Sequence, residues 1–214
     1  MKKVIILLVH FFVVAAFAQS INQFDTDGKR HGIWKKNFEN TQQLRYEGEF
    51  IHGKEIGLFK FYKLLKKKSS LTATKLFNPD DGSAEVKFLS SRGKTISEGK
   101  MIGKKYIGMW TYFHDNSNKI MTLETYNDNG LLQGERLVYY DNDQLAEKAM
   151  YNNGKIEGTS EWYSLKGVVL KSFIYENNEL HGISKVYNGK GELEAEGFYK
   201  RGKKTGIWKF YKNN

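Results

Sequence analysis

Histidines are the side chains of this sequence that most directly suggest metal binding or proton transfer. His31 and His181 each stand immediately before a glycine of a repeated pattern, while His52 and His114 fall at other places in that pattern. A neutral imidazole ligates metals and titrates near neutral pH, so two histidines in matching positions would suit either chemistry. Whether they can act together depends on how the chain repeats.

Two pairs of carboxylates are the other candidates for chemistry. Asp80 with Asp81 and Asp141 with Asp143 could be calcium ligands or a catalytic pair, but neither pair lies in a twelve-residue calcium loop, and neighbouring acids are typical of turns. The sequence has no cysteine, no phosphate-binding glycine loop, no nucleophile elbow and no His-Glu-x-x-His string. We therefore predict a protein that is not an enzyme and has neither a metal site nor a cofactor.

Residues 1–18 have the composition of a secretory signal peptide. Two lysines give a positive start, residues 4–17 form an apolar run, and Ala18 before Gln19 completes a small-x-small cleavage site. The run is short for a membrane span, which needs about 20 residues. Without a cysteine after the signal, a lipoprotein is excluded. We expect cleavage between Ala18 and Gln19 and an exported protein that is periplasmic, secreted or on the cell surface, with residues 19–214 as one repeat domain.

A glycine recurs along the rest of the chain at intervals of 24 to 26 residues. The recurring glycines, called the anchor glycines below, are Gly32, Gly57, Gly82, Gly108, Gly134, Gly158, Gly182 and Gly206. Such a regular period is the signature of a repeat architecture. Four or five residues before most of them stands another Gly or an Asn, which tolerates a positive φ and favours a tight hairpin turn.

Aromatic residues follow the anchor glycines. The pattern is clearest in Gly-Ile-Trp-Lys-Phe-Tyr at 206–211, and the aromatic two positions after the glycine is Trp34, Phe59, Trp110 or Trp208 in four units. Alternation along a strand puts this aromatic on the same face as the glycine. The return strand also closes with an aromatic, so each unit is expected to be two strands. We expect the anchor glycines to let the rings of adjacent hairpins pack across the backbone.

These features predict an all-β fold: an elongated single-layer antiparallel sheet of about eight consecutive β-hairpin repeats, roughly 75 Å long at about 4.8 Å per strand. On such a ladder His31 and His181 lie six units, roughly 55 to 60 Å, apart and cannot share a site. The unit around Gly82 is degenerate. We expect residues 63–82 to be the loop-rich part of the domain, with 63–70 as a longer exposed loop.

The string of glycine, two or three residues, His-Gly, one residue and Trp, followed by paired aromatics, resembles the MORN-repeat variant of many bacterial proteins, including a family often labelled as antitoxin components. The match is carried by residues 28–34, 53–62, 103–113, 154–163, 178–187 and 202–211. The resemblance implies consecutive antiparallel hairpins and roles in protein or membrane association, and it implies no reaction. Arg136 and Ser160 stand where the motif has its first aromatic.

The formal charge is +10, of which two charges belong to the signal, leaving +8 on the mature chain. Most lysines are scattered among acids, which is typical of a solvated, aggregation-resistant surface. The one cluster is Lys63, Lys66, Lys67 and Lys68, a possible basic contact loop for anionic lipid or polysaccharide. Export disfavours nucleic acid as a partner.

The sequence therefore favours a non-catalytic binding or scaffold module of the bacterial envelope, with another envelope or surface protein as its partner. The alternatives are a peripheral binder of anionic lipid or cell-wall polymer through a basic face, and a neutraliser of an exported toxin. Salt dependence distinguishes binding to a protein from binding to anionic lipid, because screening weakens lipid binding more than apolar docking. Lys209 and Lys212, on the strand after Gly206, favour a monomer over an edge-to-edge dimer.

Overall fold

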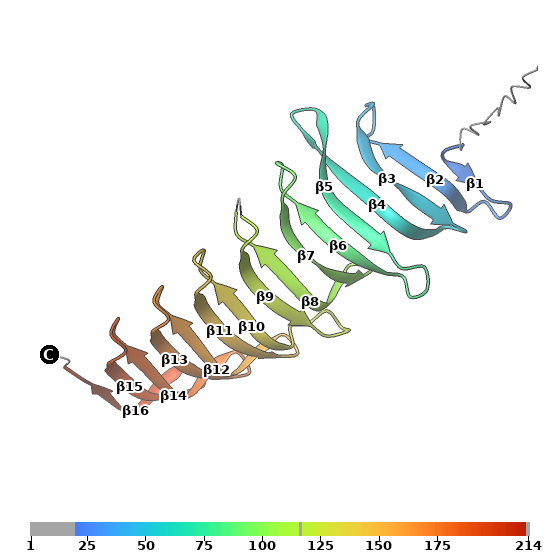
Figure 1. The fold of residues 1–214 in the computed structure, drawn as a ribbon. Coiled ribbons are helices and arrows are strands. Elements are labelled where there is room, and N and C mark those ends of the chain that lie inside the picture. Colours follow the sequence, from blue (N-terminus) through green and yellow to red (C-terminus); the bar gives the residue numbers. More distant parts are fainter. Residues whose placement is uncertain (1–19, 116, 213–214) are drawn as a thin grey trace, which may run out of the picture.

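The computed structural model describes residues 20–115 and 117–212, so the predicted signal peptide and the Ala18–Gln19 cleavage site lie outside the described residues. The described chain forms one open antiparallel sheet of sixteen strands, in which each strand pairs with its neighbours in the sequence (Figure 1). The strands are β1 (Gln23–Phe24), β2 (Arg30–Asn37), β3 (Leu44–Ile51), β4 (Lys54–Leu65), β5 (Lys68–Phe77), β6 (Ser83–Leu89), β7 (Thr95–Ile102), β8 (Lys105–Phe113), β9 (Ile120–Tyr126), β10 (Gly134–Tyr139), β11 (Leu145–Asn152), β12 (Lys155–Tyr163), β13 (Val169–Glu176), β14 (Glu179–Tyr187), β15 (Leu193–Lys200) and β16 (Lys203–Phe210). The predicted ladder of consecutive hairpins is confirmed.

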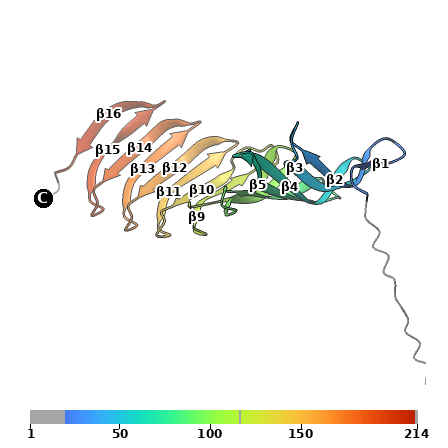
Figure 2. The same ribbon diagram turned by 90° about the horizontal axis from the view of Figure 1, so that it is seen from above.

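The sheet twists along its length. Figure 2 shows that the strands at its two ends are turned relative to each other, as expected when neighbouring strands each add a small rotation. Among the described residues, no helix is long and apolar enough to cross a membrane.

Tight turns join four of the return strands to the next unit. Between β3 and β4, His52 (φ 48°) and Gly53 (φ 82°) both have positive φ, the backbone of a type I′ turn, whose twist matches that of the flanking strands. The same pair of positive φ values recurs at Asn153–Gly154, Asn177–Asn178 and Arg201–Gly202. The Gly and Asn positions before the anchor glycines are therefore hairpin turns, as predicted.

Five of the anchor glycines lie at β-bulges. Between β3 and β4, Glu49 pairs with Ile56 and Glu47 with Lys60, so the strand bearing Gly57 has two extra residues. Shifts of the same kind surround Gly108, Gly158, Gly182 and Gly206. All eight anchor glycines have a positive φ, from 62° to 103°, which L-residues adopt only with strain.

The expected packing role of the anchor glycines is wrong. A Cβ added to an anchor glycine would meet no atom within 4 Å, except at Gly182, where Ile174 lies 3.4 Å away. The recurrent glycine is therefore required by the backbone conformation of the bulge and not by a ring above it.

Three other glycines, in the return strands, do lie beneath rings. An added Cβ on each would lie closer to the ring atoms than van der Waals contact allows, so the ring rests directly on the backbone. The pairs are Gly48 with Phe59 (2.4 Å), Gly99 with Trp110 (2.5 Å) and Gly197 with Trp208 (2.3 Å). We call these three the floor glycines. Each precedes its ring by eleven residues in the sequence.

Large and small side chains also pack together in the units where the motif aromatic is missing. Ala149 pairs with Ser160 and Phe173 pairs with Ser184, and both serines are buried. Trp162 packs edge-on against Phe173, with ring centroids 5.4 Å apart. Phe173 is thus a large side chain on the same face, and the residues that pair with it on both sides, Ser160 and Ser184, are small.

Rings from neighbouring strands pack in a zigzag along one face of the sheet, called the aromatic face below. Trp34 and Phe50, Phe50 and Phe59, and Phe59 and Phe77 meet edge to face with centroids 6.0, 5.2 and 5.2 Å apart, the arrangement that aromatic quadrupoles favour. Phe59 is 1% exposed and Trp110 is fully buried. A single layer thus makes its own core.

The third unit differs in register. β5 and β6 pair without a bulge, and Gly82 lies in the turn before β6 instead of within it. Ala84 pairs with Met101 and Val86 with Gly99, so Ala84 occupies the place that the anchor glycine has elsewhere. The assignment of Gly82 as an anchor glycine was wrong by two residues: its positive φ of 67° belongs to the turn, and without a bulge the equivalent strand position holds Ala84.

The segment 63–70 is not a loop. β4 runs to Leu65 and β5 starts at Lys68, and the turn between them consists of Lys66 (φ 48°) and Lys67 (φ 64°). Residues 63–82 are thus largely strand, and β4 and β5 form the longest hairpin of the sheet. The predicted irregularity came from the lysines, which occupy a turn that usually takes Asn-Gly.

The floor glycines lead to a direct test of this packing. Gly99→Ala should lower the free energy of unfolding by about 3 kcal/mol, because its methyl group collides with the Trp110 ring. Gly189→Ala is the matched control: its φ is not positive and no atom lies within 4 Å of the added Cβ, so its effect should stay within about 0.5 kcal/mol. Urea unfolding followed by tryptophan fluorescence measures both. Similar midpoints for the two variants would contradict this packing.

Candidate functional site

The face opposite the aromatic face, called the open face below, carries a row of apolar side chains beside a row of charged ones. Leu58, Leu76 and Met109 of the apolar row are 53%, 53% and 65% exposed. A sheet face that only meets water is usually polar. Exposed apolar side chains that gather in a row therefore mark a surface for binding.

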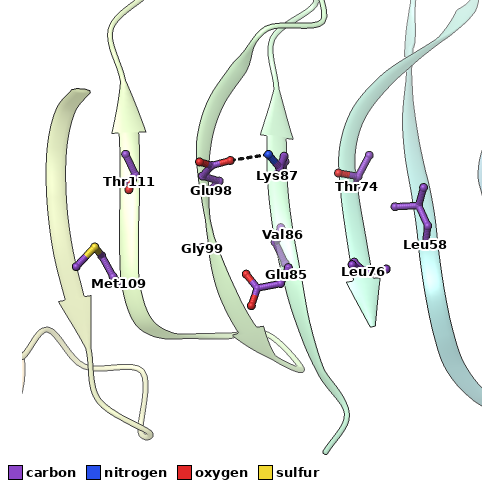
Figure 3. Close-up of a pocket in the computed structure, with 10 residues that line it drawn as sticks. All are labelled: Leu58, Thr74, Leu76, Glu85, Val86, Lys87, Glu98, Gly99, Met109 and Thr111. Carbon is purple, nitrogen blue, oxygen red and sulfur yellow. Dashed lines mark ion pairs between the residues drawn. The ribbon is translucent and has the colours of Figure 1, made fainter. Parts of the chain in front are cut away.

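A hollow of about 530 Å³ opens on this face between β4 and β8. Figure 3 shows Leu58 and Leu76 at one side of it and Met109 at the other, with the ion pair of Lys87 and Glu98 between them. The Lys87 Nζ to Glu98 Oε2 distance is 2.9 Å. The hollow is thus apolar at both ends and charged in its middle.

A second hollow of about 410 Å³ adjoins the first and shares Leu58 with it. At its centre Glu47 lies 3.4 Å from the ammonium groups of both Lys35 and Lys60. The Tyr62 hydroxyl donates a hydrogen bond of 3.0 Å to Glu47. Partial burial would raise the pKa of Glu47, but Tyr62 and the two lysines together bring it below its ordinary value. Burial and the Glu47 carboxylate raise the pKa of Tyr62 to about 12.

The charged row is balanced along the sheet. Lys148 Nζ lies 2.6 Å from Glu135, and Lys209 lies 3.6 Å from Glu196. Together with the pairs at Glu47 and Glu98, these contacts place ammonium and carboxylate groups side by side at four places between β2 and β16. The open face therefore presents both signs of charge at short intervals instead of a basic surface.

The predicted basic contact residues gather at the tip of the β4–β5 hairpin (Figure 1). Two leucines at the same tip, Leu64 and Leu65, are 40% and 41% exposed. The four lysines, all exposed, are Lys63, Lys66, Lys67 and Lys68. The tip thus combines concentrated positive charge with exposed apolar side chains, which the charge count alone did not indicate.

The histidines are distributed only partly as predicted. His31 on β2 and His181 on β14 lie twelve strands apart in the sheet and do not meet. His52 lies beside His31 with ring centroids 5.3 Å apart, a contact that was not predicted from the sequence. Its Nδ1 is 2.7 Å from Oδ2 of Asp25. The repeat period does not predict this contact, because it arises where a hairpin turn packs against the unit before it.

The other candidate residues have structural partners. Asp81 accepts a hydrogen bond of 2.8 Å from the backbone N–H of Ser83, and Asp143 pairs with Lys119 at 2.9 Å. His114 Nε2 lies 2.9 Å from a backbone carbonyl oxygen of β10. These acids thus stabilise turns, as their positions close together in the sequence suggested.

Arg136 replaces a motif aromatic and fills its place with a polar network. Its Nε donates a hydrogen bond of 3.0 Å to Glu124 and its Nη1 one of 3.3 Å to Glu147, while the Tyr126 hydroxyl donates one of 2.6 Å to Glu124. Burial would lower the pKa of Arg136, but the two carboxylates raise it. The network joins β9, β10 and β11 on the aromatic face, so this unit is closed by hydrogen bonds instead of rings.

No family model matches the sequence, and no curated protein is similar to it. Among solved structures, one similarity is to a substituted form of TarM of S. aureus in complex with fondaparinux, α-GlcNAc-glycerol and UDP, at 12% sequence identity and a TM-score of 0.22. The match covers 69% of this chain and 21% of that one, so the chain spans about a fifth of the length of that structure. A TM-score this low carries no argument about fold or function.

The apolar row of the open face was not predicted from the sequence. Its signal was present in the residue directly after an anchor glycine, which is Ile33, Leu58, Met109, Ile183 or Ile207 in five units. Strict alternation would place a polar residue at a water-facing position. The aromatic residues two positions after the anchor glycine indicate only the opposite face.

Glu47 gives the open face a measurable pH dependence. A carboxyl whose pKa is lower in the folded than in the unfolded chain stabilises the fold above its unfolded pKa, and this contribution is lost as the pH falls through the folded pKa. Glu47→Gln should therefore cost about 1 kcal/mol at pH 7 and less at pH 3. Thermal unfolding at both pH values checks this. An equal loss at pH 3 and pH 7 would show that the Glu47 charge does not contribute.

Proposed function

We propose that this chain is a non-catalytic binding module whose open face, between β2 and β8, docks another protein. The observation that carries the proposal is the exposed row of Leu58, Leu76 and Met109 in two adjoining hollows. The aromatic face already packs against itself, so its rings are used in folding. Burying three such side chains against a partner contributes about 1.5 to 3 kcal/mol each at most.

The chemistry of the partner follows from the two rows. Lysines paired with glutamates, as at Lys87 and Glu98, offer a polyanion repulsive as well as attractive contacts. A protein segment with apolar side chains flanked by both signs of charge fits such a surface better. The seven strands from β2 to β8 span about 30 Å, enough for a standard interface of about 800 Å² per partner.

We further propose that the protein acts in the bacterial envelope and belongs with the MORN-repeat variants. The signal-like segment at 1–18 supports export, and an open ladder of hairpins agrees with the architecture that the resemblance implies. The partner would then be an envelope or surface protein. A scaffold needs several contact points on a rigid support, which a long sheet of repeats provides.

Capture from envelope extract tests the docking face. The double variant L58E/M109E should lose at least about tenfold of the binding shown by the parent chain, because two central apolar contacts become charged. Leu165→Glu is the matched control: Leu165 is 58% exposed but lies in the turn between β12 and β13. Retained binding at about 0.5 M salt is expected for apolar docking.

Two results would contradict the docking proposal. One is equal capture by the parent and by L58E/M109E when the double variant has the parent's thermal stability. The other is equal loss in the double variant and in Leu165→Glu, which would reflect a general effect of added negative charge.

A second candidate function, peripheral binding of anionic lipid, is favoured by the β4–β5 hairpin tip. Leu64 and Leu65 can enter the interfacial region of a bilayer while the neighbouring lysines meet acidic headgroups, each worth about 1 kcal/mol. Cosedimentation with phosphatidylglycerol vesicles should then fall sharply between low and high salt and be lost in K66E/K67E. Binding that is unchanged by salt and by K66E/K67E, or no binding at all, would contradict the lipid-binding function.

A further inference from the structure

We propose that Asp25, His31 and His52 form a binding site for a divalent transition-metal ion at the N-terminal end of the ladder. One carboxylate oxygen and one nitrogen of each imidazole all lie within 4.8 Å of one another. The three residues come from three places: Asp25 follows β1, His31 is on β2, and His52 is in the β3–β4 turn. This juxtaposition exists only in the folded ladder.

Asp25 is held in the orientation that a ligand needs. Its Oδ1 accepts hydrogen bonds from the backbone N–H groups of Asp27 (3.0 Å) and Lys29 (2.8 Å). These bonds leave Oδ2 directed at His52. The Asp25 side chain is only 9% exposed, whereas that of His52 is 66% exposed. One ligand is therefore fixed, and another is free to adjust.

The two histidines are joined by the backbone as well as by contact. The N–H of Gly53, the residue after His52, donates a hydrogen bond of 2.8 Å to the carbonyl oxygen of Arg30, the residue before His31. The turn that carries one imidazole is thus fastened to the strand that carries the other. Closing the site needs side-chain rotation without movement of the sheet.

Two imidazoles and a carboxylate are a ligand set that zinc prefers. Zn–N and Zn–O bonds of about 2.0 to 2.2 Å place tetrahedral ligand atoms about 3.4 Å apart. The Asp25–His52 contact of 2.7 Å must open slightly, and the widest separation, at most 4.8 Å, must close by up to about 1.4 Å. Exposed imidazoles can do both. A fourth position remains for water or for a donor atom of another molecule.

The C-terminal half of the ladder contains a natural comparison. His181 precedes Gly182 as His31 precedes Gly32, and Gly202 N–H donates a hydrogen bond to the carbonyl oxygen of Leu180 as Gly53 does to that of Arg30. The residue before Gly202, however, is Arg201. A guanidinium cannot ligate a metal, so the equivalent turn has one imidazole only, beside Glu176 at 3.1 Å.

Titration of the purified, tag-free protein with ZnCl₂ in a calorimeter tests the site, with Co²⁺ absorption as a report on coordination geometry. The parent should bind one equivalent with signals that require both histidines. His31→Ala and His52→Ala should each weaken binding at least about tenfold. Asp25→Asn keeps the Oδ1 acceptor of the turn and removes the anionic ligand, so it should weaken binding without unfolding the turn. His181→Ala is the matched control and should bind like the parent.

Each outcome decides the proposal. No binding by the parent, or unchanged binding by His31→Ala or His52→Ala, overturns the site. A loss in His181→Ala equal to that in His31→Ala shows that zinc binds elsewhere and also overturns it. Unchanged affinity of Asp25→Asn excludes the three-residue ligand set. Circular dichroism of each variant, matching the parent, ensures that a loss of binding is not a loss of fold.

Discussion

A sheet of one layer has no second layer to cover its apolar side, and the packing of this chain depends on how that side is closed. The closure rests on the contact between a ring and a bare backbone: Phe59 on Gly48, Trp110 on Gly99. Without a Cβ beneath it, a ring can lie flat across the neighbouring strand and reach the ring of the next unit. The zigzag of edge-to-face contacts then removes the largest side chains from water.

Closing one face by its own side chains leaves the other face available. Leu58 and Met109 each follow an anchor glycine at a bulge, and both are exposed on the open face. Their exposure has no role in the packing described for the aromatic face. A partner that supplies apolar side chains would act as the missing second layer, which is the physical content of the proposed binding function.

The sequence predicted the period, the turns and the ring positions, because each depends on local chemistry: a positive φ at Gly or Asn, and alternation along a strand. It did not predict why the anchor glycines are there, since a bulge is defined by pairing with another strand. Gly82 was misassigned for this reason. The floor glycines could have been found from their constant distance of eleven residues to a ring, but the meeting of His31 and His52 depends on the packing of a turn against the previous unit.

The central claim, that one face is closed and the other open, is tested most directly by the oxidation of two methionines. Met101 is 7% exposed on the aromatic face and Met109 is 65% exposed on the open face, on adjacent strands. Brief treatment with hydrogen peroxide, followed by mass spectrometry of the peptides, measures both rates in one molecule. The structure predicts that Met109 is oxidised at least about tenfold faster than Met101, since oxidation follows exposure. Equal rates for the two sulfur atoms would contradict the division of the sheet into a closed and an open face.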